Sequence, residues 1–201
     1  MLPKGKDGVK WTFDRFVALF GLVAVSPAFL AIYLAIKVSE PSQPAFFRQL
    51  RIGQHAKPFY ILKFRNMKKD ATGSHITVAG DERLTSIGKF LRRFKLDELP
   101  QLWNVAKGEM SFVGPRPDVP GYADKLEGED AVILSLKPGI TGPATLKYRN
   151  EEEILSRQED PLLYNDTVIW PDKVRINREY ALNHSFAGDL KIILQTLHII
   201  K

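Results

Sequence analysis

The longest uncharged stretch of the chain lies close to its N-terminus. Residues 16–36 form a run of 21 residues without a charged side chain. A helix of about 20 apolar residues matches the hydrocarbon thickness of a bilayer. The run is long for a core helix of so small a domain. No small-residue cleavage site follows it, which disfavours a signal peptide. We therefore expect it to insert into a membrane.

The centre and flanks of this run bear on its topology. Ser26-Pro27 lies at its centre, where proline removes a helical hydrogen bond and favours a kink. A spanning helix usually carries its basic bias on one side, whereas this run has basic residues on both: Lys4, Lys6, Lys10 and Arg15 before it, and Lys37, Arg48 and Arg51 after it. This pattern indicates a re-entrant helix with both ends on the cytoplasmic face. From the residues alone, a kinked single span remains an open alternative.

A β-hairpin is predicted after this segment. Its strands are expected at 45–50 and 59–66, joined through residues 52–58. Because side chains alternate along a strand, Lys63 and Arg65 share one face. The alternate positions form the other face, which we expect to pack on the core: Tyr60, Leu62 and Phe64.

The rest of the chain is predicted to be mainly helical. Apolar spacing and proline or glycine boundaries predict helices from Ile87, from Leu99-Pro100 to Gly108, from Pro171 to about Asn183, and from Asp189 to Ile200. In the first, Phe90, Leu91 and Phe94 share one face. The last either lies on the bilayer surface or packs in the core, which we favour. Residues 68–82, 111–120 and 137–143 are expected to be loops, the first of them mobile.

These elements predict an α+β fold. It is a mostly helical, membrane-associated domain with a small β-hairpin or sheet and an N-terminal re-entrant helix. Residues 1–38 form the membrane region, kinked at Ser26-Pro27, and residues 39–201 form a domain on the cytosolic face with interfacial helices.

Composition excludes several kinds of catalytic site but does not identify the reaction. The net charge of +6 suits an anionic partner: nucleic acid, phospholipid or a phosphorylated substrate. The absence of cysteine excludes disulfides, thiolate metal sites and cysteine nucleophiles. The four histidines lack metal-ligand spacing, and neither a phosphate-binding P-loop, a dinucleotide fingerprint nor a serine-hydrolase elbow occurs.

The densest charged cluster contains two adjacent carboxylates, Asp97 and Glu98, directly after Arg92, Arg93 and Lys95. Cations and the start of a helix both favour an ionised carboxylate. An ionised aspartate is a competent nucleophile toward phosphorus and a hard oxygen ligand for magnesium. Judged from this segment alone, a helix cap by Asp97 is the better interpretation.

Other cations stand beside glycine- and proline-rich turns. Arg116 lies in Gly114-Pro115-Arg116-Pro117, and Arg149 follows the loop of Pro138, Gly139, Ile140, Thr141 and Gly142. Phosphoryl transfer depends on such donors for positioning and charge stabilisation. Each arginine alone is more simply a surface residue.

Several motifs together give the chain a specific resemblance. Residues 81–117, DERLTSIGKFLRRFKLDELPQLWNVAKGEMSFVGPRP, resemble the core signature of bacterial sugar transferases of the monotopic phosphoglycosyl transferase superfamily. The strand motif at 63–67, the loop at 138–142 and the central Ser-Pro are similar to those of the family. The resemblance covers most of residues 11–150 and little of 151–168. Asn66 and Ala106 depart from it, as do the residues after Gly142.

The resemblance implies a minimal catalytic form lodged in the cytoplasmic leaflet of the bacterial inner membrane, with its active site on the cytoplasmic side. It implies transfer of a sugar phosphate from a UDP-sugar to polyprenol phosphate, releasing UMP and initiating glycoconjugate assembly. Asp97 would be the covalent nucleophile, Glu98 its partner, and Mg²⁺, for which Mn²⁺ can substitute, would bind near Asp97. The matching phosphate-binding positions are Lys63, Arg65, Arg92, Arg116 and Arg149.

The resemblance also bears on partners. It implies membrane lipid and no nucleic acid, and leaves a homo-oligomer open. The alternative from another class is a membrane-anchored basic binding module without catalysis. Charge and anchor are compatible with it, but it offers no reason for Asp97-Glu98 amid cations.

Overall fold

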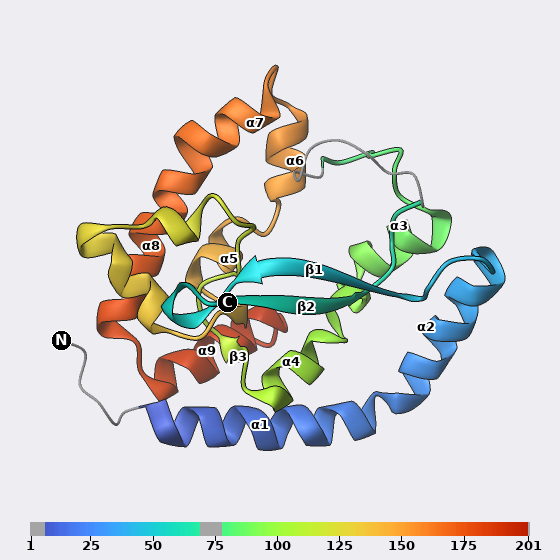
Figure 1. The fold of residues 1–201 in the computed structure, drawn as a ribbon, viewed down its shortest axis with the longest axis horizontal. Helices are drawn as coiled ribbons and strands as arrows, with labels where there is room; N and C mark the ends of the chain where they lie inside the picture. The colour runs from blue at the N-terminus through green and yellow to red at the C-terminus, as the bar shows by residue number, and fades with distance from the viewer. Residues whose placement is uncertain (1–6, 69–77, 201) are drawn as a thin grey trace.

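The computed structural model describes residues 7–68 and 78–200, and begins with two helices that meet at a bend (Figure 1). Helix α1 spans Asp7–Ala24 and α2 spans Ser26–Ser39, and their axes are bent by 60°. The predicted kink at Ser26-Pro27 is confirmed. Ser26 Oγ donates to the Val23 carbonyl oxygen at 2.7 Å. Among the described helices, none alone is long and apolar enough to cross a bilayer, whereas this bent pair meets that criterion together.

The predicted hairpin is confirmed and crosses the middle of the molecule (Figure 1). Strand β1, Phe46–Ile52, pairs antiparallel with β2, Pro58–Phe64, so that Phe46 faces Phe64. The short 3₁₀ turn η1, Gln54–Ala56, lies in the connection.

The hairpin does not bury one face alone, so the predicted inward face was wrong for Tyr60. Tyr60 is 51% exposed, and the Arg48 guanidinium lies over its ring. The buried residues of β2 are Ile61 and Phe64, three positions apart. Ile61 packs with Ala18 of α1, whereas Phe64 packs with residues of α2 and the next helix. Different helices therefore cover parts of both faces.

Two short helices follow the hairpin. Helix α3 spans Ser86–Arg93 and α4 spans Gln101–Lys107, with the 3₁₀ turn η2, Leu96–Glu98, between them. Gly108, at φ +81°, ends α4 as predicted, because glycine tolerates the left-handed conformation.

The face of α3 on which Phe90, Leu91 and Phe94 were predicted to lie together is not buried as a whole. Leu91 is fully buried, but Phe90 and Phe94 are each 56% exposed and pack on each other, with ring centroids 4.9 Å apart. Only the Leu91 side of this short helix meets the cluster formed by α2 and β2. Of the predicted loop at 68–82, residues 69–77 lie outside the described part.

Two of the predicted loops contain a small parallel sheet. Strand β3, Ser111–Val113, pairs with β4, Gly139–Thr141. Their backbones approach so closely that a Cβ at Gly139 would lie 2.1 Å from the Gly114 nitrogen. Position 139 therefore requires glycine because a side chain would clash with the neighbouring backbone. The preference of glycine for turns does not reveal this requirement.

The C-terminal part consists of short helical segments and two longer helices. The segments are η3 Ala123–Lys125, η4 Gly128–Ser135, α5 Pro143–Lys147, α6 Glu151–Ser156, α7 Pro161–Tyr164, the π-helical η5 Asn165–Ile169, α8 Trp170–Asn183 and α9 Phe186–Thr196. Pro171 lies in the first turn of α8 as predicted, although helical backbone already leads into it through α7 and η5.

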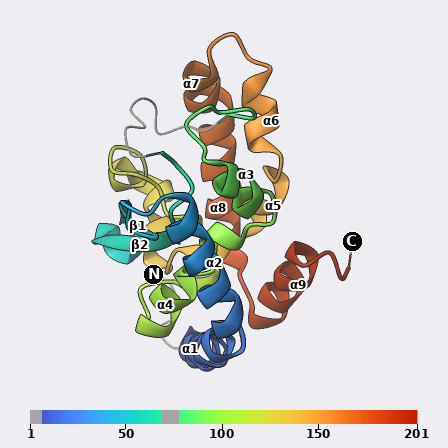
Figure 2. The same ribbon diagram turned by 90° about the vertical axis from the view of Figure 1, so that its right-hand side faces the viewer.

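Helix α9 is buried on one side only. Ile192 and Ile193 pack against the cluster containing Val113 and Tyr180. The opposite residues remain exposed: Leu190, Leu194 and Leu197. The predicted core packing is thus confirmed for half of the helix. Figure 2 shows α9 to the side of the column formed by α6, α7 and α8.

A cluster of buried polar residues, here termed the N-terminal clasp, joins α1 to the rest of the fold. It consists of Lys10, Asp14, Ser111, Tyr180 and Asp189. Lys10 Nζ forms an ion pair with Asp189 and donates to the Val113 carbonyl oxygen at 2.8 Å. Ser111 Oγ donates to Asp14 at 2.6 Å. Lys10 was counted among the basic flanking residues, but it is an internal residue of the fold.

Candidate active site

Asp97 and Glu98 lie in η2, between α3 and α4, where the chain reverses next to the end of β2. Asp97 is only 4% exposed, and its Oδ2 accepts a hydrogen bond from Asn66 Nδ2 at 2.8 Å. Pro100 precedes α4, and no side chain caps that helix. The cap interpretation of Asp97 is therefore wrong. The side chain that contacts Asp97 is Asn66, which the sequence had marked only as a departure from the family pattern.

Glu98 is held by two cations from separate parts of the chain. Both terminal nitrogens of Arg116 donate to its carboxylate, one of them at 3.4 Å, and Lys63 Nζ lies 3.3 Å from Oε1. Lys63 comes from β2, and Arg116 from the turn after β3. The structure thus gathers four predicted site residues, Lys63, Asp97, Glu98 and Arg116, around one turn.

The two neighbouring carboxylates have opposite pKa shifts. Burial, together with the Glu98 charge, raises the pKa of Asp97 above its ordinary value. Burial alone would also raise the pKa of Glu98, but Arg116 and Lys63 hold that pKa well below its usual range. The expectation that cations favour an ionised Asp97 was therefore wrong in its net direction. Divergent environments of paired acids are typical of catalytic sites.

The Arg116 turn is fixed by backbone contacts with the predicted loop at 138–142. Gly139 N donates to the Pro115 carbonyl oxygen at 2.8 Å, and Gly114 N donates to the Thr141 carbonyl oxygen at 2.9 Å. A Cβ at Gly142 would lie 2.3 Å from the Gly114 carbonyl oxygen. Pro138 accepts from Ser111 N at 2.9 Å. These loop residues support the turn that presents Arg116.

Three other predicted cations have different surroundings. Arg92 forms an ion pair with Glu152 of α6, and its charge acts on Asp97. Arg65 Nε donates to the Pro44 carbonyl oxygen at 2.9 Å. Arg149 contacts His198 and, at 3.1 Å, the Gln195 carbonyl oxygen, both near the end of α9.

Sequence reasoning missed further charged residues around Arg116. Arg51 Nη1 donates to the Pro117 carbonyl oxygen at 3.1 Å, and burial together with Arg116 lowers the pKa of Arg51 to about 10. Burial raises the pKa of Asp118 to about 6, against the opposing charge of Lys173. Asp118 directly follows the Pro-Arg-Pro turn, which was the available signal. No sequence signal pointed to Arg51, which was counted only among the basic residues that follow the apolar run.

The oxygen atoms around Asp97 suit a hard cation that takes most of its ligands from substrate phosphates and water. No group of three or more histidine, cysteine, aspartate or glutamate residues is arranged for a metal among the described residues. Within the same residues, Asp97 Oδ2 is hydrogen-bonded and Oδ1 has no hydrogen-bond partner. Mg²⁺ commonly binds through one or two carboxylates plus substrate phosphates and water. One free oxygen on a buried carboxylate fits that requirement.

Comparison with known proteins supports the family resemblance. The family model described as bacterial sugar transferase matches residues 5–201. The chain belongs to the bacterial sugar transferase family. The predicted family is thereby confirmed, and with it the class of enzyme, a transferase.

Named relatives share this sequence at moderate identity. The Bacillus subtilis (strain 168) protein named uncharacterized sugar transferase EpsL is 35% identical over 94% of this chain and 85% of its own length. Two proteins named UDP-glucose:undecaprenyl-phosphate glucose-1-phosphate transferase are also similar. That of Escherichia coli (strain K12) is 38% identical over 92% of this chain and 38% of its own length. That of Caulobacter vibrioides is 37% identical over 94% of this chain and 68% of its own length. The chain thus spans well under half of the Escherichia coli relative.

Proposed function

We propose that this protein is a phosphoglycosyl transferase that moves a sugar phosphate from a UDP-sugar to a membrane polyprenol phosphate. The observation that carries the proposal is the geometry of the two adjacent carboxylates: Glu98 is held by Arg116 and Lys63, while the buried Asp97 keeps one oxygen without a hydrogen-bond partner among the described residues. The names of family members, which specify undecaprenyl phosphate and sugar phosphates, support the same reaction.

In the first proposed step, an Asp97 oxygen forms a bond to the phosphorus attached to the sugar. The bond from that phosphorus to the bridging oxygen breaks, and UMP leaves with the electron pair. Arg116 and Lys63 are placed to stabilise charge on the transferred and departing phosphates, which is the main demand of phosphoryl transfer. Burial raises the pKa of Asp97, so a larger share of this residue is protonated at a given pH than of an ordinary aspartate, and only the ionised form attacks.

In the second step, an oxygen of polyprenol phosphate attacks the same phosphorus. The bond to Asp97 breaks, which restores the free carboxylate and gives polyprenol diphosphate sugar. Glu98 lies next to Asp97 in the same turn, and its ion pairs keep its carboxylate ionised. Its charge therefore holds Arg116 and Lys63 in place during both steps.

Asp97, through Oδ1, would hold Mg²⁺ together with the donor's phosphates. When bound, the ion would neutralise developing phosphate charge. The buried carboxylate then gains a counter-charge that favours its ionised form. Activity should therefore vanish with EDTA and return with magnesium or manganese; full activity in chelated protein would exclude this role.

The bent pair of α1 and α2 would lodge the protein in the cytoplasmic leaflet of a bacterial inner membrane. The exposed apolar side chains of both helices support this: Phe16, Phe20, Val23, Leu30 and Leu34. A re-entrant arrangement brings the lipid substrate laterally to the site while the charged donor arrives from water. Single cysteines introduced near Lys6 and near Gln43, at the exposed positions Gly8 and Ser42, should both label from the cytoplasm, and periplasmic labelling of either would contradict it.

The order of events gives the sharpest test. Enzyme and UDP-sugar alone should release a burst of UMP, and a phosphosugar adduct should map to the peptide containing Asp97. Asp97→Asn should abolish both, because an amide is a poor nucleophile. Asp166→Asn, an exposed residue of η5, is the matched control and should keep both.

A direct mechanism, in which a carboxylate only activates the lipid phosphate, gives a different result. It releases UMP only when polyprenol phosphate is present and forms no adduct. A panel of UDP-sugars supplies the donor. If no donor yields product or UMP, with or without lipid, the protein is a binding module and the proposed reaction is wrong.

A further inference from the structure

Arg92 is connected to a part of the chain in which the sequence shows little family resemblance. Its Nη2 forms an ion pair with Glu152 of α6, although the two residues are 60 positions apart. The Arg92 side chain is mostly buried, whereas that of Glu152 is 40% exposed. Figures 1 and 2 show α6 on the same side of the molecule as α3.

The ion pair occupies only one edge of the guanidinium. Within the described part of the chain, Nη1 and Nε of Arg92 have no hydrogen-bond partner, and the Arg92 charge acts on Asp97. Guanidinium offers five donors in a rigid fork, so one edge can bind a carboxylate while the other binds a phosphate. The arrangement is that of a cation oriented by a carboxylate behind it.

Helix α6 is itself firmly held. Leu155 is 1% exposed, and Glu151 forms an ion pair of 2.6 Å with Lys173 of α8. The Glu152 carbonyl oxygen accepts a hydrogen bond from Ala79 N at 3.2 Å, which connects α6 to the segment before α3. Glu152 therefore projects from a fixed helix, and this is what a residue needs in order to orient another side chain.

We propose that Glu152 is a positioning residue that aims the free edge of Arg92 at the diphosphate of the donor. The proposal rests on the proposed function for the identity of that ligand. It extends the functional residues to α6, which none of the recognised motifs includes. Glu152 acts through Arg92 and does not itself touch the substrate.

The test measures binding of UDP with Mg²⁺ by calorimetry, so it does not depend on turnover. Glu152→Gln keeps the size of the side chain but removes its charge, and it should weaken UDP binding about tenfold, in the range seen when supporting groups are removed. Glu153→Gln is the matched control: it is the next residue of α6, and its carboxylate forms an exposed ion pair of 2.5 Å with Arg157. Its affinity should equal that of the unaltered protein.

A double-mutant cycle separates positioning from a general structural effect. If Glu152 acts through Arg92, then Glu152→Gln should add no further loss, within about twofold, once Arg92→Ala is present. Equal losses in both backgrounds would overturn the proposal, as would unchanged or tighter binding by Glu152→Gln alone. Failure of sugar-phosphate transfer with this coupling intact would instead count against the proposed reaction.

Discussion

The active-site cluster of Lys63, Asp97, Glu98 and Arg116 and the N-terminal clasp are both charged, but they differ in how completely their groups are buried and paired; the Arg116 side chain, for example, is 41% exposed. In the clasp, Lys10 Nζ contacts Asp189, the Val113 carbonyl oxygen and, at 3.4 Å, the Tyr180 hydroxyl. The Tyr180 hydroxyl in turn donates to Asp189 Oδ1 at 2.6 Å. The three donors of the lysine and both oxygens of Asp189 are engaged.

The active-site cluster contains hydrogen-bonding groups that have no protein partner among the described residues. Among the described residues, Lys63 Nζ has one hydrogen-bond partner, Glu98, and Asp97 has one, Asn66. Buried polar groups are normally satisfied because an unpaired one is costly. A buried cluster whose groups pair with one another therefore indicates a structural role, whereas a partly exposed cluster with free donors and acceptors is able to bind a ligand. Mutations in the clasp should accordingly lower stability, whereas mutations in the active-site cluster should lower activity.

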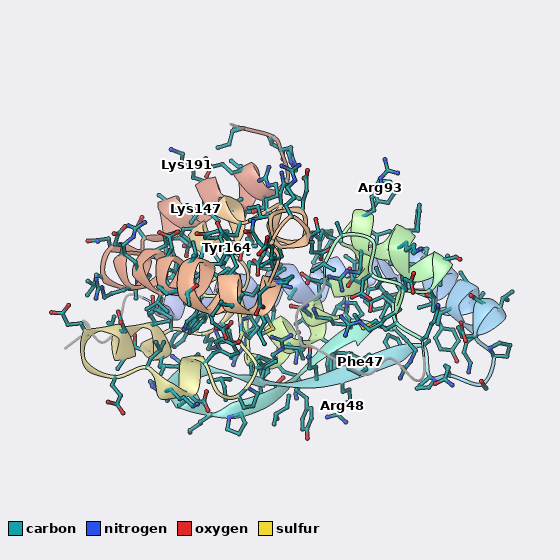
Figure 3. All side chains as sticks on the ribbon, turned by 90° about the horizontal axis from the view of Figure 1, so that it is seen from above. Phe47, Arg48, Arg93, Lys147, Tyr164 and Lys191 are labelled. Carbon is teal, nitrogen blue, oxygen red and sulfur yellow. The ribbon has the colours of Figure 1, made fainter. Side chains whose placement is uncertain are left out.

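The largest effect is expected from opening the clasp. Lys10→Met leaves Asp189 buried without its counter-charge, and breaking one partner of such a pair costs about 3–5 kcal/mol of unfolding free energy. Denaturation in detergent measures this loss. Lys191→Met on α9 is the control, because Lys191 is exposed on the surface seen in Figure 3 and should change stability by less than about 0.5 kcal/mol. Equal stability of the two variants would remove the structural role of the clasp.

The next effect concerns Glu98 and should appear in rate, not stability. Glu98→Gln retains hydrogen-bonding capacity but releases Arg116 and Lys63 from a negative charge. Loss of one preorganised electrostatic group commonly lowers kcat by about 10²–10³-fold. Single-turnover formation of the polyprenol product measures this, and the melting temperature should stay close to that of the unaltered protein. A melting temperature that falls as far as that of Lys10→Met would mean that this cluster is structural as well.

The smallest effect is a displaced pH profile. Activity needs ionised Asp97, and because the pKa of Asp97 is raised, kcat/KM should rise with pH through a value above the ordinary aspartate range. The Asn66 amide donates to the ionised carboxylate and so favours it. Asn66→Ala should therefore move the acid limb of kcat/KM to higher pH, whereas Asn165→Ala, a partly exposed residue of η5 whose amide donates to Asp166, should leave it in place. A limb that does not move would show that Asn66 does not tune Asp97.

Whether a face of a helix or strand is exposed or buried is likewise not determined by the spacing of its apolar residues. Figure 3 shows Phe47 and Arg48 of the hairpin toward one edge of the molecule, and Arg93, Lys147 and Lys191 toward the opposite edge. Helical spacing predicted that Phe90, Leu91 and Phe94 share one face, yet only Leu91 of the three is buried. Periodicity identifies the faces of an element, but which of them is buried depends on the elements that pack against it.

The sequence by itself determined the features that depend on neighbouring residues. Proline at position 27 breaks the apolar run, Gly108 ends α4, and the alternation around 45–66 forms a hairpin, because backbone geometry and hydrogen bonding act over a few positions. The motif from 81 to 117 likewise indicated the family and the carboxylate pair.

Only the tertiary structure decided which distant groups meet. It brought Arg116 and Lys63 to Glu98, Asn66 to Asp97 and Glu152 to Arg92, and it placed Arg149 beside α9. It also reversed the expected pKa shift of Asp97, because burial and the charge of Glu98 outweigh the nearby cations. Electrostatic interaction depends on distance and on exclusion of water, and neither is encoded in spacing along the chain.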